Sequence, residues 1–136
     1  MLVEDDAEDI FLTKDALEKS KLSITLDIVR NGEDAMQYLH KEGPFAKTVM
    51  PDLIILDLNL PKKNGWDVLK EVRNDKRLKS LPITILTTSN QDPDIQCAYD
   101  MGANSYVTKP VSITEFHRVV HTIEDFWFTI VKLPPH

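Results

Sequence analysis

The sequence has little cysteine and no long apolar run. A single cysteine, Cys97, among 136 residues excludes an internal disulfide framework and is typical of proteins from a reducing compartment. Every apolar run is far shorter than the roughly 20 residues that span a bilayer. No basic segment followed by a signal-like apolar core opens the sequence. We therefore expect a cytoplasmic protein that does not enter a membrane.

Basic residues are also in deficit. The chain carries 16 Lys and Arg against 22 Asp and Glu, a formal net charge of -6. Proteins that bind nucleic acid directly usually present a basic stripe or helix to the phosphates, so we expect no nucleic-acid partner. Part of the acidic excess is concentrated in Glu4-Asp5-Asp6 and Glu8-Asp9. Such a cluster either begins a solvated helix or lies beside a cation.

The length and composition indicate one folded domain. Hydrophobic residues make up 42% and charged residues 28%, as in folded globular proteins rather than disordered ones. A chain of 136 residues is long enough for one core and short for two. No repeat or linker interrupts it. We expect one domain over residues 1–125 and an apolar tail, residues 126–136, that continues the last helix.

Short β-branched runs alternate with longer segments of helical spacing, a pattern typical of βα units around a parallel sheet. Continuous apolar runs at 53–56 and 83–86 predict central strands covered on both faces, and residues 26–29 and 105–107 predict weaker strands. Before the acids the first strand has only Met1-Leu2-Val3, so either the sheet begins with a stub or the numbering begins inside a longer chain. The pattern predicts an α/β, doubly wound fold.

Several helix starts are marked by their residues. Asp92-Pro93 predicts an N-cap followed by proline at the first helical position, and Ser112 with Glu115 fits a capping box. His117 and His121 have metal-like spacing but lack an HExxH pattern, so we expect them to be solvated. The last helix carries an apolar stripe formed by Phe116, Val119, Val120, Ile123 and Trp127.

Polar residues follow the predicted strands at their carboxyl ends, where doubly wound sheets bind ligands. Carboxylates that pack together repel one another unless a cation shares the site. An all-oxygen cluster suits Mg²⁺, which would also neutralise charge on a phosphoryl group and let a carboxylate act as nucleophile. A lysine would supply a point charge for the phosphoryl oxygens. The residues that would converge are Glu4, Asp5, Asp57, Thr87 and Lys109.

Five segments in this order resemble the receiver domain of two-component response regulators: Val3-Glu4-Asp5-Asp6, residues 56–61, Gly65, Thr87 and Lys109-Pro110. The end of the chain, with Asp125-Phe126-Trp127 and Leu133-Pro134-Pro135, is similar to stand-alone regulators that partner bacterial phytochrome-type kinases. The resemblance covers nearly the whole chain. It implies a flavodoxin-like (βα)5 fold of strand order 2-1-3-4-5 and a phosphoacceptor regulator rather than an enzyme. It also implies Mg²⁺ as cofactor and a sensor histidine kinase as partner, of phytochrome type by the similarity of the chain end.

The resemblance implies roles for individual residues. Asp57 would be the phosphoacceptor, and Glu4, Asp5, Asp57 and the backbone carbonyl of Asn59 would bind Mg²⁺. Glu4 stands where the family often has aspartate, a change that preserves the charge. The remaining implied roles are contact with the phosphoryl group by Thr87 and Lys109, the conformational switch by Thr87 and Tyr106, and control of dephosphorylation by Asn59 and Ser89. The Lys109-Pro110 bond resembles the family's cis peptide.

The tail is more apolar than one buried stripe requires. Trp127 continues the stripe, so Phe126, Phe128 and Ile130 are expected to point elsewhere and to form a homodimer contact. The alternative is that the tail folds back over its own domain.

Other functions fit the sequence less well. A small Mg²⁺-dependent aspartyl phosphohydrolase would carry a D-x-D pattern after the first strand, which Val3-Glu4-Asp5-Asp6-Ala7 lacks. A flavin-binding domain would need a phosphate loop rich in Ser, Thr or Gly there, and a transcription factor would need an added DNA-binding module. A degenerate receiver that binds partners without phosphorylation is disfavoured because the acidic, hydroxyl and lysine positions are intact.

Overall fold

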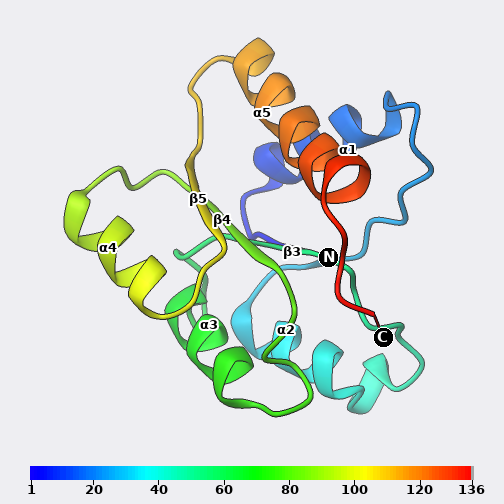
Figure 1. Ribbon diagram of the computed structural model, residues 1–136, viewed down its shortest axis with the longest axis vertical. Coiled ribbons are helices and arrows are strands. Elements are labelled where there is room, and N and C mark those ends of the chain that lie inside the picture. The colour runs from blue at the N-terminus through cyan, green and yellow to red at the C-terminus, as the bar shows by residue number, and fades with distance from the viewer. Residues whose placement is uncertain (136) are drawn as a thin grey trace.

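The computed structural model describes residues 1–135 and places one parallel sheet between two layers of helices (Figure 1). The strands follow the order β2-β1-β3-β4-β5 and all pair in parallel. The predicted doubly wound α/β fold and its strand order are therefore confirmed. The strands are β1 (Leu2–Val3), β2 (Ile28–Val29), β3 (Ile54–Leu56), β4 (Ile83–Thr87) and β5 (Ser105–Thr108).

The helices cover both faces of the sheet. They are α1 (Ala7–Glu18), α2 (Gly32–His40), α3 (Gly65–Asn74), α4 (Asp92–Asp100) and α5 (Ile113–Asp125). Helices α1 and α5 pack on one face, and α2, α3 and α4 cover the other (Figure 1). Within residues 1–135, no helix has the length and apolar character needed to cross a membrane.

The continuous apolar sequence of β3 follows from this layering. Ile54 and Leu56 belong to the core beneath α2 and α3, whereas Ile55 belongs to the core beneath α1 and α5. Because both faces of a central parallel strand are buried, successive side chains must all be apolar. The short strand β1 lies between β2 and β3, where the chain reverses its direction of progress across the sheet. The residues after β1 and β3 are therefore neighbours at the switch point.

Side-chain caps fix several helix starts. The side chains of Asp6, Asn31, Asn64 and Ser112 each accept a hydrogen bond from the backbone N–H three residues later. The predicted cap at Asp92 is displaced by one residue, because α4 begins at Asp92 and Gln91 holds the N-cap position. The capping box at Ser112 differs too, since the Glu115 carboxylate pairs with Arg118. No cis peptide bond occurs within residues 1–135, so the expectation for Lys109-Pro110 is wrong.

The two histidines of α5 face α1 rather than solvent, contrary to expectation. His117 Nε2 lies 3.3 Å from Asp15 Oδ2. His121 Nε2 lies 2.8 Å from the Ala16 carbonyl oxygen. Both rings are partly buried because α1 and α5 pack side by side. The spacing of four residues therefore reflects contact between helices.

The chain beyond α5 continues as a π-helical turn, η2 (Phe126–Ile130). Trp127 packs toward the core as predicted, and its indole Nε1 donates a 3.0 Å hydrogen bond to the buried Thr84 hydroxyl of β4. Phe126 is 47% exposed and Ile130 is 70% exposed. Phe128 instead packs partly against the core beneath α1 and α5, so its predicted outward orientation is wrong.

Candidate functional site

Three carboxyl groups meet at the carboxyl edge of the sheet. Glu4 and Asp5 follow β1, and Asp57 follows the adjacent strand β3. Each offers an oxygen, and these oxygens lie within 4.8 Å of one another. Glu4 and Asp57 are buried and Asp5 is exposed, which leaves one side open to solvent. A hard, all-oxygen donor set of this kind fits a divalent cation such as Mg²⁺ or Mn²⁺.

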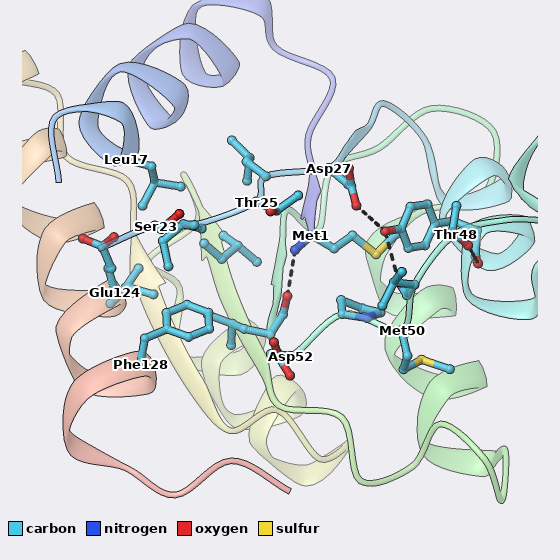
Figure 2. Close-up of a pocket in the computed structure, with 18 of the residues that line it drawn as sticks. Met1, Leu17, Ser23, Thr25, Asp27, Thr48, Met50, Asp52, Glu124 and Phe128 are labelled. Atoms are coloured by element: carbon cyan, nitrogen blue, oxygen red, sulfur yellow. Dashed lines mark hydrogen bonds between the residues drawn. The ribbon is translucent and has the colours of Figure 1, made fainter. Parts of the chain in front are cut away.

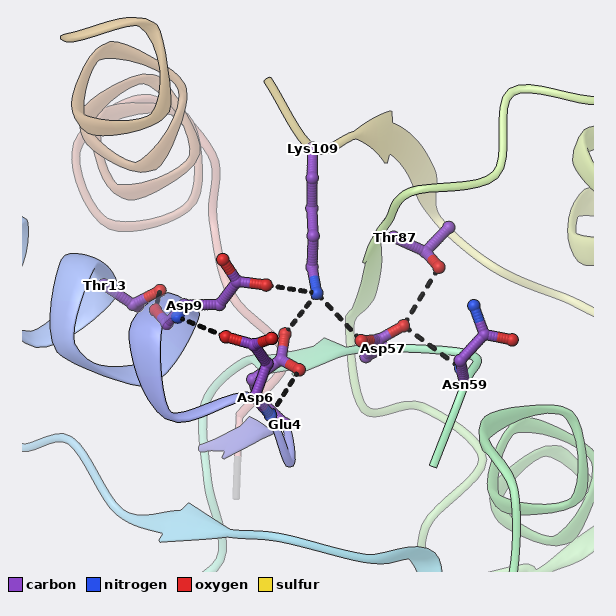
Figure 3. Close-up of polar contacts among 8 residues, drawn as sticks. All are labelled: Glu4, Asp6, Asp9, Thr13, Asp57, Asn59, Thr87 and Lys109. Atoms are coloured by element: carbon purple, nitrogen blue, oxygen red, sulfur yellow. Dashed lines mark hydrogen bonds and ion pairs between the residues drawn. The ribbon is translucent and has the colours of Figure 1, made fainter. Parts of the chain in front are cut away.

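Lys109 neutralises part of this charge. Its Nζ lies 2.6 Å from Glu4 Oε1, 2.8 Å from Asp9 Oδ2 and 2.8 Å from Asp57 Oδ2 (Figure 3). The side chain is only 6% exposed, so these ion pairs are weakly screened. Burial disfavours the ammonium charge, but hydrogen bonds to Asp57, Asp9 and Glu4 outweigh it and hold the pKa of Lys109 above its usual range.

Asp57 is held as a carboxylate by groups on three strand ends. The Thr87 hydroxyl donates to Asp57 Oδ1 at 2.9 Å, and the Asn59 backbone N–H donates to the same oxygen at 3.1 Å. Burial alone would raise the pKa of Asp57, but the Lys109 and Asn59 hydrogen bonds outweigh it and keep the pKa below its usual range. Asp57 is therefore ionised at neutral pH and oriented at both oxygens.

Glu4 has the opposite shift. Burial raises the pKa of Glu4 from 4.5 to about 7, although Lys109 opposes the change. The pKa values of Glu4 and Asp57 thus shift in opposite directions, because Asp57 accepts more hydrogen bonds than Glu4. Near neutral pH, a cation that bound at this site would displace the proton of the Glu4 carboxyl group, which would pass to water.

This shift predicts a stabilising effect of Glu4→Gln in metal-free protein. A group whose folded pKa lies above its unfolded value stabilises the fold below about pH 4.5 and loses that contribution as pH rises through 7. Glutamine imitates the protonated form, and Lys109 keeps two other carboxylate partners. We expect Glu4→Gln to raise the free energy of unfolding by about 2 kcal/mol at pH 8 and by little at pH 5.

Urea unfolding with a chelator at both pH values measures this difference. Glu8→Gln, on the exposed side of α1, controls for the general loss of one negative charge. A Glu4→Gln variant less stable than wild type at pH 8 would contradict the proposed cost of the buried charge.

Two features of the site escaped the sequence analysis. Asp9 contacts Lys109, although the residues are 100 positions apart, and an acid in a first helical turn looks like an ordinary dipole partner. Gly65 closely approaches the backbone of Asp57 and Leu58. A Cβ at Gly65 would lie 2.2 Å from the Asp57 carbonyl oxygen. No local pattern predicts either contact.

Tyr106 and Ser89 lie together beside the site. The Tyr106 hydroxyl donates to the Ser89 carbonyl oxygen at 2.9 Å, and the Ser89 hydroxyl donates to Asp94 Oδ2 at 2.5 Å. Tyr106 is half-buried and packs on the core beneath α2 and α3. The structure thus brings Glu4, Asp5, Asp57, Thr87 and Lys109 into one cluster and places Tyr106 with Ser89 next to it. The Asn59 side chain is exposed.

A cavity of about 680 Å³ lies beside the amino-terminal end of β1 (Figure 2). Its walls include Leu17, Met50 and Phe128, and the Tyr38 hydroxyl bonds to Asp27 at its rim. Because parallel strands share one direction, this end of the sheet is opposite the carboxylate cluster. The cavity is therefore separate from the candidate site.

Comparison with known proteins gives concordant matches. The sequence profile described as "Response regulator receiver domain" matches residues 1–121. The chain is 39% identical to response regulator Rcp1 of Synechocystis sp., over 98% of this chain and 91% of that protein. The solved structure of the phosphorylated cyanobacterial phytochrome response regulator RcpA has 43% identity and a TM-score of 0.95, covering 98% of this chain and 96% of that one. The Mn²⁺-bound form of Rcp1 has 39% identity and a TM-score of 0.94, with the same coverage.

Proposed function

We propose that this chain, which belongs to the response regulator receiver domain family, is a phosphoacceptor switch whose Asp57 takes a phosphoryl group from a histidine kinase. One observation carries the proposal. The Asp57 carboxylate is buried, ionised and held by Lys109 and Thr87 beside Glu4 and Asp5. This arrangement supplies a nucleophile, two donors for phosphoryl oxygens and a cation site.

Each residue of the site has a separate role in phosphoryl transfer. An Asp57 carboxylate oxygen attacks phosphorus, a P–O bond forms, and the P–N bond of a phosphohistidine breaks with its electron pair passing to the imidazole, which then takes a proton. Lys109 and Thr87 donate hydrogen bonds to the transferred group. Bound Mg²⁺, held by Glu4, Asp5 and Asp57, with the Asn59 carbonyl as a further ligand, would offset the phosphoryl charge.

Phosphoryl transfer from a small donor tests the proposal. Wild-type protein incubated with acetyl phosphate and Mg²⁺ should gain one phosphoryl group by intact-mass analysis, and a chelator should prevent the gain. An unlabelled wild type under both conditions would favour the degenerate receiver, which binds partners without phosphorylation.

A protein donor fits the surface around the site. Phe11 and Val111 lie two residues beyond Asp9 and Lys109, and they are 64% and 105% exposed. Exposed apolar side chains on the segments that carry site residues suit contact with another protein. The names of the relatives associate them with phytochromes. We therefore infer that this chain acts in the cytoplasm, with a sensor histidine kinase of phytochrome type as its partner.

The switch role is assigned to Thr87 and Tyr106. The Thr87 hydroxyl donates a hydrogen bond to Asp57. The Tyr106 hydroxyl donates one to the carbonyl oxygen of Ser89, on the loop that follows β4. When Thr87 turns to a phosphoryl oxygen, the loop after β4 shifts and the Tyr106 ring moves inward. Asn59 and Ser89 lie on the loops after β3 and β4 and are assigned to control of water access during dephosphorylation.

The switch predicts a defect in Thr87→Ala. This variant should still be labelled, but the amide resonances of Ser89 and Tyr106 should shift far less on phosphorylation than in wild type. Thr87→Ser keeps the hydroxyl and should retain the shifts. Equal shifts in wild type and Thr87→Ala would remove Thr87 from the relay.

The exposed side chains of η2 support a homodimer. Phe126 and Ile130 form the contact in this proposal, whereas Phe128 contributes little because it is partly buried. A symmetric pairing buries the same patch on both subunits. We expect dimers by light scattering for wild type and monomers for a Phe126→Asp, Ile130→Asp variant. Phe11→Asp, on α1, is the control for loss of an exposed aromatic, and a monomeric wild type would rule the dimer out.

A further inference from the structure

The ammonium group of Lys109 has its three donors fully used. A lysine ammonium offers three N–H groups, and Glu4, Asp9 and Asp57 each accept one. Figure 3 shows Asp9 approaching Lys109 from α1, on the side away from Thr87. The Lys109 ammonium group therefore lies between α1 and the ends of β1 and β3, and contacts all three.

Two of the three acceptors have a second task. In the proposed function, Asp57 receives the phosphoryl group and Glu4 turns toward the cation. Asp9 lies outside the carboxylate group that could hold a metal, as far as the described residues show. Its contact with Lys109 can therefore persist while the other two change.

The backbone holds Asp9 firmly in place. Its N–H donates to Asp6 Oδ1 at 3.0 Å, and its carbonyl accepts from the Thr13 hydroxyl at 2.8 Å. The Asp9 side chain is 21% exposed and reaches Lys109 from the first turn of α1. A short side chain on a capped helical turn has few alternative positions, so it is suited to orient a longer one.

We propose that Asp9 is a positioning residue: it anchors the Lys109 ammonium where the phosphoryl oxygens arrive, throughout the reaction. This inference rests on the proposed function, because it assigns Lys109 to the phosphoryl group. Without Asp9, the ammonium moves toward Glu4 and Asp57 and competes with the cation for their oxygens. Loss of the negative charge of Asp9 also weakens cation binding. The displaced ammonium and the lost charge therefore both lower the affinity for the cation.

A double-mutant cycle between Asp9 and Lys109 tests the anchor. Asp9→Ala should lower the rate of labelling by acetyl phosphate about tenfold at saturating Mg²⁺ and should weaken Mg²⁺ binding measured by titration calorimetry. In a Lys109→Met background, Asp9→Ala should have no further effect on the labelling rate. Glu8→Ala removes a neighbouring exposed carboxylate and should label like wild type, and Asp9→Glu should recover part of the rate.

A second readout needs neither metal nor phosphoryl donor. In chelated protein, Asp9→Ala should lower the urea midpoint, because Lys109 loses a partner. In the Lys109→Met background the same change should raise the midpoint, because it relieves repulsion from Glu4 and Asp57. The proposed role of Asp9 would be wrong if Asp9→Ala changed the urea midpoint equally in the two backgrounds, or if Asp9→Ala were labelled as fast as Glu8→Ala. Either result would leave the proposed function of the chain unaffected. Absence of labelling in wild type would overturn both.

Discussion

Asp57→Asn is expected to abolish phosphoryl labelling by acetyl phosphate and Mg²⁺. The carboxylate of Asp57 is the ionised group that Lys109 and Thr87 orient. Asparagine keeps the size and the hydrogen-bond acceptor of the side chain but lacks a nucleophilic carboxylate oxygen. Labelling should fall to background while the fold is retained, since the amide oxygen can still accept from Lys109. Intact-mass analysis measures the loss.

Two controls make this result specific. Asp67→Asn changes an exposed aspartate on α3 and should leave the yield of labelled protein unchanged. The wild-type adduct should also be lost in alkaline solution, as expected for an acyl phosphate. An adduct of equal yield in Asp57→Asn would show that another residue is the phosphoacceptor.

Gly65→Ala is expected to destabilise the protein by about 3 kcal/mol, the upper range for overpacking. The added Cβ would lie 2.2 Å from the Asp57 carbonyl oxygen and 2.6 Å from Leu58 Cα. Both obstacles are backbone atoms, so no side-chain rotation relieves the contact. Helix α3 must move away from the end of β3, and the Asp57 segment must move with it. Urea unfolding should therefore show lower stability, and labelling should slow.

Gly43→Ala separates steric contact from backbone conformation. Gly43 has a φ of +54°, and the nearest atom to an added Cβ is Gln37 Oε1 at 4.0 Å. An alanine at position 43 has room for its Cβ but must adopt the left-handed backbone conformation, which lowers the free energy of unfolding by about 1 kcal/mol. We expect Gly65→Ala to be the more harmful change and Gly43→Ala to leave labelling intact. The reverse order would refute the steric argument for Gly65.

Much of the architecture was predictable because it depends on local patterns. The runs at 53–56 and 83–86 contain the buried strand β3 and most of the buried strand β4. Four of the helices begin directly after a residue with a capping side chain. The ends of the short strand β2 are the least predictable from the sequence. It lies at the sheet edge and pairs only through Ile28 and Val29, so its sequence carries a weak apolar signal.

The sequence alone determined which side chains could meet at the carboxyl edge, since strand order and parallel direction bring the ends of β1, β3, β4 and β5 together. Contacts across layers needed the tertiary structure. The contact between Asp9 and Lys109 depends on how closely α1 approaches the end of β5. The path of the chain after α5 decided that Trp127 bonds to Thr84 and that Phe128 turns inward. Periodicity defines one face of an element but not its partner, because packing depends on how whole layers cross.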